Sequence, residues 1–205
     1  MKIAIIGSGN VGGALAQQFK KVGHTVLVGT KYPMSEKSIK LATTIGEDHF
    51  TSVENAAKTC EVIIITTPPE AILSLLPSLG DISSKIVIDA TNSVRIKPEP
   101  YATAFEAIKK TTGSDKVVKC FNTTGFENML NPKYGDEGID MFCAGNDKAS
   151  KEIVIQLCRD IGFKNCWDFG GDDKVELLEK FALSWINLAI MQGHGLDIAF
   201  KVVRR

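Results

Sequence analysis

Three glycines near the start of the chain are spaced as a phosphate-binding turn requires. The stretch IAIIGSGNVGGALAQQF, residues 3–19, sets Gly7, Gly9 and Gly12 between a β-branched apolar run and a helix-like run. In a strand–turn–helix order, free amides at the helix start face an anion, and glycine lets the backbone come close to it. We interpret Gly7 as the tight turn, Gly9 as the approach to a pyrophosphate and Gly12 as the contact of helix with strand.

The end of the next apolar run indicates which dinucleotide such a turn would bind. A site for NAD usually carries Asp or Glu there, whose carboxylate bonds the ribose 2′-hydroxyl. Here the run VLVG ends at Thr30 and Lys31 instead, and Ser35 and Lys37 follow closely. Hydroxyl and ammonium groups would hold a 2′-phosphate that a carboxylate would repel. The sequence therefore favours NADP(H) over NAD(H).

Small polar residues also follow three later apolar runs. They are Thr66, Thr67 and Pro68 after the first run, Asp89, Thr91 and Asn92 after the second, and Asn122, Thr123 and Thr124 after the third. The carboxyl ends of parallel strands meet at one edge of a sheet, where ligands bind. We therefore expect the first two groups to border the cofactor and the third to face a second ligand. Asp89 equally suits a cap for the neighbouring loop.

These residues need a sheet to position them, and the pattern of apolar runs predicts one. Apolar, β-branched runs occur at 2–6, 24–29, 61–66, 85–90, 116–121, 138–144 and 163–169. Helix-like segments lie between them at 11–21, 53–59, 69–79, 101–111, 148–160 and 173–191. This alternation predicts a Rossmann-type doubly wound α/β fold with a mainly parallel sheet. We expect a dinucleotide-binding domain at 1–140 and a small C-terminal extension of helix and strand at 141–205.

Composition argues against several classes of function. A binder of nucleic acid or of a membrane surface would carry an excess of Lys and Arg. The 205 residues include 24 basic and 24 acidic side chains, so neither partner is expected. The start MKIAIIG lacks the pattern of a signal peptide, and the apolar run 181–191 is shorter than the roughly 20 residues that span a bilayer. We expect a cytoplasmic protein.

Cysteine and histidine show no metal-binding spacing. The five cysteines are irregularly spaced without a CxxC motif, and the three histidines are scattered. This usage is typical of reduced, mostly buried thiols, and the sequence predicts no metal site. The apolar last helix and the stretch GHGLDIAF after it suggest a packed interface, so we expect a homodimer.

Several stretches resemble one known family. IAIIGSGNVGGALA, VGTK, KVVKCFNTTGFENMLNP and the C-terminal LEKFALSWINLAIMQGHGLDIAFKVVRR are similar to the NADP oxidoreductases that use the deazaflavin coenzyme F-420. They also resemble the cytosolic reductase domain of the six-transmembrane ferric reductases. The resemblance implies that NADPH lies over the strand ends, in contact with Ser8, Gly9, Asn10 and Val11 at the pyrophosphate, Thr30 and Lys31 at the 2′-phosphate, and Thr67 and Pro68 beside the nicotinamide. At FNTTG the chain departs from the histidine-containing stretch of the deazaflavin enzymes, so the acceptor stays open.

We therefore predict an NADP(H)-dependent oxidoreductase that transfers hydride between NADPH and a flavin or deazaflavin, with FMN, FAD or coenzyme F-420 as second ligand and ferric iron as an onward acceptor. Hydride transfer between stacked rings needs no protein acid or base, and no catalytic residue is assigned. Two alternatives remain. One is a hydroxyacid or imine dehydrogenase, in which Lys180 and Asn187 on one helix face orient the substrate. The other is a non-catalytic NADPH-binding sensor.

Overall fold

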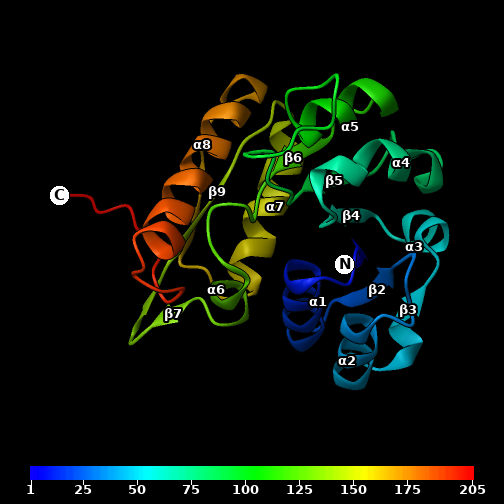
Figure 1. Cartoon of the computed structure of the whole chain (residues 1–205), viewed down its shortest axis with the longest axis horizontal. Coiled ribbons are helices and arrows are strands. Elements are labelled where there is room, and N and C mark those ends of the chain that lie inside the picture. The colour runs from blue at the N-terminus through cyan, green and yellow to red at the C-terminus, as the bar shows by residue number, and fades with distance from the viewer.

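Six parallel strands form the central sheet of the protein, which the computed structural model describes over residues 1–205. Their order across the sheet is β3-β2-β1-β4-β5-β6, so the direction of winding reverses between β1 and β4 (Figure 1). The strands are β1 Lys2–Ile6, β2 Thr25–Gly29, β3 Phe50–Thr51, β4 Val62–Ile65, β5 Ile86–Asp89 and β6 Val117–Lys119. The fold is thus the Rossmann-type doubly wound α/β fold that the sequence predicts.

Side chains that alternate along the strands fill two apolar cores, one on each face of the sheet. On β1, Ile3 and Ile5 enter the first core, while Ala4 and Ile6 enter the second. The helices that contribute to the first core are α1 Asn10–Lys21, α2 Glu36–Ile45, α6 Phe126–Leu130 and α7 Lys148–Asp160. Those of the second core are α3 Val53–Thr59, α4 Ile72–Leu75, α5 Ala104–Thr112 and α8 Val175–Ile186. Covered on both faces, β4 is buried along its whole length, which explains its continuous apolar sequence.

The C-terminal part continues the sheet beyond β6. Strands β9 Asp140–Cys143 and β10 Asn165–Asp168 pair in parallel, and Ala144 exchanges two backbone hydrogen bonds with Lys119 at the end of β6. Helix α8 runs on into a π-helical turn, Asn187–Met191, and lies on the opposite side of the molecule from α3 (Figure 1). The first core extends from β1 into β9 and α7, so the division at residue 140 stays a prediction.

Two departures from the expected elements have local causes. Helix α2 was not expected; it buries only Ser38, Leu41 and Ile45, so its buried stripe is short and begins with a polar residue. The segment 69–79, expected as one helix, is α4 flanked by short 3₁₀ turns. Proline lacks an amide donor and starts a turn more readily than it continues a helix, and Pro69 and Pro77 both stand at such starts.

The long segment 122–138 is less irregular than its sequence suggests. It contains the short helix α6, Phe126–Leu130, and a whole hairpin formed by β7, Lys133–Tyr134, and β8, Glu137–Gly138. Helix α6 packs against α1 beside the glycine turn. No helix of the protein combines the length and the apolar composition that a membrane span requires.

Candidate functional site

The turn between β1 and α1 has the backbone geometry of a phosphate loop. Gly7 has a φ of +115°, a region that favours glycine, and its amide donates to the Gly29 carbonyl at 2.9 Å. A Cβ on Gly12 would lie 2.1 Å from the Gly7 carbonyl oxygen, because α1 passes directly over the turn. A Cβ on Gly9 would meet nothing within 4 Å. The turn is therefore tight at Gly7 and Gly12 and open at Gly9.

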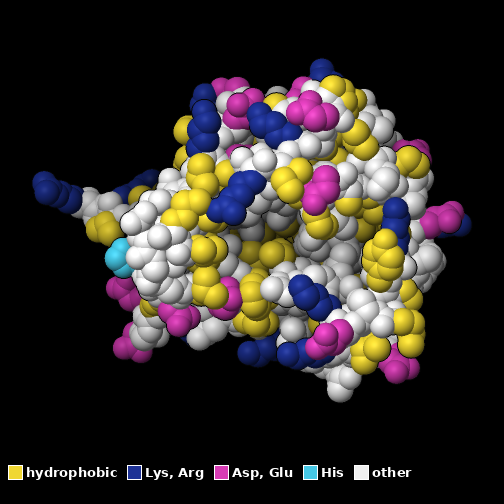
Figure 2. Space-filling view, viewed as in Figure 1, with side chains coloured by type: hydrophobic (Ala, Val, Ile, Leu, Met, Phe, Trp, Pro, Cys, Tyr) yellow, Lys and Arg dark blue, Asp and Glu magenta, His cyan; other side chains and the backbone are white.

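A cavity of about 380 Å³ opens over this turn and between the ends of β1, β2 and β4. This position, at the switch point of the sheet, is where doubly wound folds bind ligands. The face drawn in Figure 2 is hollowed near its middle, with Lys or Arg side chains on either side of the hollow. The cavity brings together most of the residues predicted to bind the cofactor, namely Gly7, Ser8, Gly9, Thr30, Lys31, Ser35, Lys37, Thr66, Thr67 and Pro68.

The lining of this cavity fits an anionic dinucleotide. It includes Lys31 and Lys37 but no Asp or Glu. Neither lysine forms an ion pair with an acidic side chain, so both ammonium groups are available to a phosphate. The hydroxyl oxygen of Thr67 is buried in the cavity wall without a hydrogen-bond partner. An orphaned buried hydroxyl is costly, and a bound ligand would satisfy it.

A buried hydroxyl that the sequence analysis missed organises the end of the cavity near Ser8 and Ser35. Ser38 is fully buried, and its Oγ lies 2.7 Å from the Ser8 Oγ and 2.8 Å from the Ser35 Oγ. It also donates to the Tyr32 carbonyl oxygen at 2.8 Å. Ser38 thereby joins the glycine turn, the loop after β2 and the N-cap of α2. The pair Ser35 and Ser38 at the start of a helix is a signal that could have identified α2.

Two residues of the predicted pyrophosphate contact stand outside the main cavity. Asn10, the first residue of α1, lines a neighbouring cavity of about 290 Å³ together with Gly9 and Phe126. Val11 lines neither cavity and packs against the first core. Lys37 borders both cavities and so stands between them. The side chain of Val11 therefore faces the core, and any contact of Val11 with a phosphate would use its backbone.

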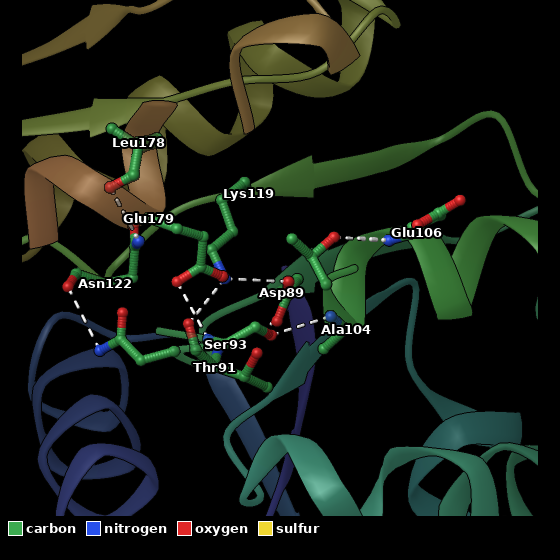
Figure 3. Close-up of polar contacts among 11 residues, drawn as sticks. Asp89, Thr91, Ser93, Ala104, Glu106, Lys119, Asn122, Leu178 and Glu179 are labelled. Atoms are coloured by element: carbon green, nitrogen blue, oxygen red, sulfur yellow. Dashed lines mark hydrogen bonds and ion pairs between the residues drawn. The ribbon is translucent and has the colours of Figure 1, made fainter. Parts of the chain in front are cut away.

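The residues after β5 and β6 do not line the main cavity, but two of them have unused hydrogen-bonding capacity. The Thr91 Oγ1 and the Asn122 Oδ1 are buried without a partner. Asn92 is exposed and donates from Nδ2 to the Asn122 carbonyl oxygen at 3.4 Å, which joins the two strand ends (Figure 3). The ends of β5 and β6, next to that of β4, thus hold two buried polar atoms without hydrogen-bond partners.

Thr123 and Thr124, predicted on the side of the second ligand, point into the protein. The Thr123 hydroxyl donates to the Met141 sulfur at 3.5 Å. The Thr124 hydroxyl accepts from the Asn128 Nδ2 at 2.7 Å. Both threonines are buried, so their side chains serve the packing of the loop and of α6.

The backbone at the end of β6 is strained. Phe121 has a φ of +62°, and it is the one residue other than glycine with a positive φ. Bulky residues rarely adopt this conformation, which costs about 1–3 kcal/mol and occurs preferentially at functional sites. Its side chain is fully buried, and its T-shaped contact with Phe19 stabilises it. The strained residue directly precedes Asn122 and fixes the direction in which the chain leaves the strand.

Three charged residues that the sequence analysis did not bring together form a buried cluster below the same strand ends (Figure 3). The Lys119 Nζ donates to the Asp89 Oδ2 at 3.0 Å, to the Glu179 Oε1 at 2.7 Å and to the Thr91 carbonyl oxygen at 2.6 Å. Burial alone would lower the pKa of Lys119, but the two carboxylates hold that pKa above its ordinary value. Burial raises the pKa of Glu179, against the opposing effect of Lys119.

Asp89 both caps a loop and forms an ion pair. Its Oδ1 accepts from the Thr91 amide at 2.9 Å, which is the loop-capping role that its sequence position suggested. Its Oδ2 accepts from Lys119. Glu179 comes from α8, and nothing in the local sequence marks it as the partner of a lysine located 60 positions earlier.

The cysteines are closer in space than in sequence. The sulfur atoms of Cys120, Cys158 and Cys166 all lie within 4.8 Å of one another, and those of Cys120 and Cys158 are 3.6 Å apart. All three thiols lie in the first apolar core, and burial raises the pKa of Cys158 well above its ordinary value. Irregular spacing in the sequence therefore gave no ground for excluding a thiol cluster. The absence of a metal stays a prediction.

Comparisons with known proteins agree with this geometry. Residues 2–93 match the family described as NADP oxidoreductase coenzyme F420-dependent. The chain is 28% identical to the F420-dependent NADP reductase of Methanocaldococcus jannaschii, over 97% of this chain and 98% of that protein. It is 25% identical to the human metalloreductase STEAP2, over 78% of this chain but only 32% of that protein.

A solved structure resembles the whole chain. A protein provisionally named F420-dependent NADP-reductase, from Arthrobacter sp. FB24, superposes with a TM-score of 0.88, covers all of both chains and is 25% identical. An imine reductase from Streptomyces aurantiacus has a TM-score of 0.68 at 15% identity, which shows the shared fold alone. The resemblance that the sequence motifs predicted is confirmed: over its whole length the chain is similar to proteins named as F420-dependent NADP reductases.

Proposed function

We propose that the chain transfers hydride between NADPH and a flavin or deazaflavin. The observation that carries this proposal is the cavity at the switch point of the sheet, which combines the glycine turn with Lys31 and Lys37 and contains no acidic side chain. When bound there, NADPH would supply the hydride. The residues of the chain bind and orient it and exclude water from it.

The cavity assigns a role to each group of residues. The open backbone at Gly9 and the start of α1 face the pyrophosphate, because helix N-termini attract anions. Ser8, Thr30 and Lys31 lie where the end of β2 meets the turn, and they hold the 2′-phosphate. The unpartnered hydroxyl of Thr67 at the end of β4 is free to orient the nicotinamide half.

The second ligand belongs at the ends of β5 and β6. The unsatisfied Thr91 Oγ1 and Asn122 Oδ1 stand there, one and two strands away from β4. A deazaflavin is favoured as acceptor because the relative from M. jannaschii bears that coenzyme in its name. The likeness to metalloreductases makes FMN, FAD and ferric chelates further candidates.

The geometry gives less support to a hydroxyacid or imine dehydrogenase. Lys180 and Asn187 do share one groove on α8, as their spacing predicted. That groove has no lining residue in common with the nucleotide cavity. Neither side chain is therefore placed to orient a substrate against the nicotinamide.

A homodimer and a cytoplasmic location remain part of the proposal. The last helix and its π-helical turn expose several large apolar side chains, namely Leu177, Leu188, Ile190 and Met191. Exposed apolar patches of this kind mark interaction sites. Light scattering of the purified protein would measure twice the mass of one 22.2 kDa chain if the dimer forms.

The test is NADPH oxidation, followed at 340 nm, with coenzyme F-420, FMN, FAD and a ferric chelate as separate acceptors. We expect turnover with a deazaflavin or flavin and little without an acceptor. NADPH binding without oxidation in every reaction would instead support the non-catalytic sensor.

A further inference from the structure

The buried cluster of Asp89, Lys119 and Glu179 has a defined net charge. The side chains of Asp89 and Lys119 are fully buried, and that of Glu179 is 6% exposed. Lys119 uses all three of its N–H donors within the cluster, two on carboxylates and one on the Thr91 carbonyl oxygen. The ammonium is therefore protonated and its hydrogen bonds are complete.

Hydrogen-bond geometry fixes both carboxyl groups as carboxylates. The second oxygen of Asp89 accepts from the Thr91 amide, and the Glu179 Oε2 accepts from the Ser93 amide at 3.0 Å. Each of the four carboxylate oxygens thus faces an N–H donor. A protonated carboxyl would carry an O–H donor, for which these N–H groups offer no acceptor. Two carboxylates and one ammonium leave the cluster with a charge of −1.

No other side chain neutralises this charge. None of the three residues is paired with a fourth charged side chain. The polar partners that complete the cluster are the backbone groups of Thr91 and Ser93, whose dipoles stabilise the charge without cancelling it. A net charge buried in this way acts through protein and is only weakly screened by salt.

The charge lies beside the predicted path of the nicotinamide. Asp89 is the last residue of β5 and pairs with Ile65 on β4, directly before Thr66 and Thr67 of the cavity wall. Lys119 is the last residue of β6, one strand further on. Neighbouring strands lie about 4.8 Å apart, so the cluster stands one to two strand widths from the end of β4.

We infer that Asp89, Lys119 and Glu179 act together as a fixed negative charge that strengthens binding of NADP⁺ relative to NADPH. The inference rests on the proposed function. Hydride transfer breaks a C–H bond of the reduced nicotinamide and forms a C–H bond on a deazaflavin or an N–H bond on a flavin. Two electrons leave with the hydride, and the nicotinamide ring becomes positively charged. The remaining parts of the nucleotide are the same in both forms, so the cluster distinguishes the two forms through the ring charge.

This charge favours oxidation of NADPH over reduction of NADP⁺. One unit charge about 10 Å away, at an effective dielectric constant of about 20, changes a binding constant by roughly tenfold. Glu179 is a positioning residue in this account, because it acts through the charge of the cluster and touches neither ring. The role is electrostatic, so it predicts a change in relative affinity that loss of packing alone would not produce.

The test compares dissociation constants for NADP⁺ and NADPH, measured by calorimetry at pH 8, in wild type and in Glu179→Gln. We expect the ratio of the NADP⁺ constant to the NADPH constant to rise roughly tenfold in the variant. Glu179→Asp keeps the charge and should leave the ratio within about twofold of wild type. Glu176→Gln removes an exposed charge of the same sign from α8 and should also leave the ratio within about twofold of wild type.

Three results would overturn the inference. The first is a folded Glu179→Gln protein with an unchanged ratio of the two dissociation constants. The second is a change of this ratio in Glu179→Asp that equals the change in Glu179→Gln. Should Glu179→Gln fail to fold, Asp89→Asn removes the same charge from β5 and decides in its place. The third applies to the wild type, which must bind NADP⁺ more tightly than NADPH; the reverse order contradicts the inference. If wild type bound neither nucleotide, the proposed function would fail first, and the inference with it.

Discussion

The two halves of the sheet edge are built differently. Around β1, β2 and β4 the strand ends open onto a cavity lined by glycine, hydroxyl groups and two unpaired lysines. Around β5 and β6 they close over buried polar atoms, a strained Phe121 and a buried ion cluster. The first half offers exposed positive charges and open backbone to an anionic ligand. The second offers fixed charge and fixed hydrogen-bond acceptors.

This difference indicates that the two halves have different roles in binding the nucleotide and in selecting the acceptor. Phosphates supply affinity, and flexible lysines at a solvent-exposed rim suit that purpose. Selecting an acceptor and biasing a redox step both need groups that do not move, because preorganised dipoles and charges act without reorganisation. We therefore expect substitutions in the first half to change nucleotide affinity, and substitutions in the second half to change acceptor use or the redox balance.

The largest effect should follow from Gly12→Ala. The added Cβ would lie 2.1 Å from the Gly7 carbonyl oxygen and 2.6 Å from the Thr66 Oγ1, so the turn must shift. We expect a loss of about 1–3 kcal/mol in the free energy of unfolding, together with loss of NADPH binding. Urea denaturation and calorimetry would measure both.

Gly9→Ala is the matched control for that substitution. Its Cβ would touch no atom of the protein, and the φ of −71° suits any residue. Its stability should stay within about 0.5 kcal/mol of wild type. NADPH affinity should still fall, because the added methyl group blocks the approach of the pyrophosphate. Equal affinity in Gly9→Ala and wild type would show that the nucleotide does not pass over Gly9.

Lys31→Glu should reverse the nucleotide preference of the first half. A carboxylate at this position repels a 2′-phosphate and accepts from a ribose hydroxyl. NADPH affinity should drop roughly tenfold while NADH affinity stays level or rises. Lys58→Glu, an exposed change of the same charge on α3, is the control. A wild-type protein that binds NADH as tightly as NADPH would show the interpretation of Thr30 and Lys31 to be wrong.

Asn122→Ala should act on the acceptor alone. The substitution removes one unsatisfied buried oxygen and one long hydrogen bond, from the Asn122 Nδ2 to the Leu178 carbonyl oxygen at 3.5 Å, so it should cost the folded protein about 1 kcal/mol. Loss of a hydrogen bond to the acceptor should raise the acceptor KM about fivefold. The NADPH dissociation constant should not change. A variant that lost NADPH affinity and kept its acceptor KM would place Asn122 in the nucleotide half and contradict the separate roles of the two halves.

The smallest effect should come from added zinc. Three thiolates and Zn²⁺ would leave a charge of −1 in the apolar core around Cys120, Cys158 and Cys166, which is unfavourable without a counter-charge. We expect no change in melting temperature with equimolar Zn²⁺ and no cobalt–thiolate absorption with Co²⁺. Stoichiometric zinc in the purified protein, lost in Cys158→Ser, would reveal a metal site.

The first half could be predicted from the sequence because the residues that indicate it are close together in the chain. The glycine turn, the following helix and the residues after VLVG lie within about 30 positions of one another, and each has a known backbone requirement. Ser38 escaped notice because it lies on α2, a helix that the sequence analysis did not expect. The parallel sheet was equally predictable, since β-branched runs alternate regularly with helical ones.

The second half was only partly readable, because its contacts join distant parts of the chain. Asn122 was predicted at the correct edge, but Thr123 and Thr124 turn inward to Met141 and Asn128. The pairing of Lys119 with Glu179 joins β6 to α8, and only the fold brings them together. The same holds for the three thiols, which come from three separate elements.

The central claim is that hydride moves from NADPH to an acceptor ring on this protein. Its most direct test uses NADPH carrying deuterium at the transferred position of the nicotinamide, a deazaflavin acceptor and mass spectrometry of the product. In a reduced deazaflavin the transferred hydrogen sits on carbon and does not exchange with water. The account predicts one deuterium in the reduced deazaflavin. NADPH that binds in the cavity and is never oxidised, or a reduced product without deuterium, would contradict it.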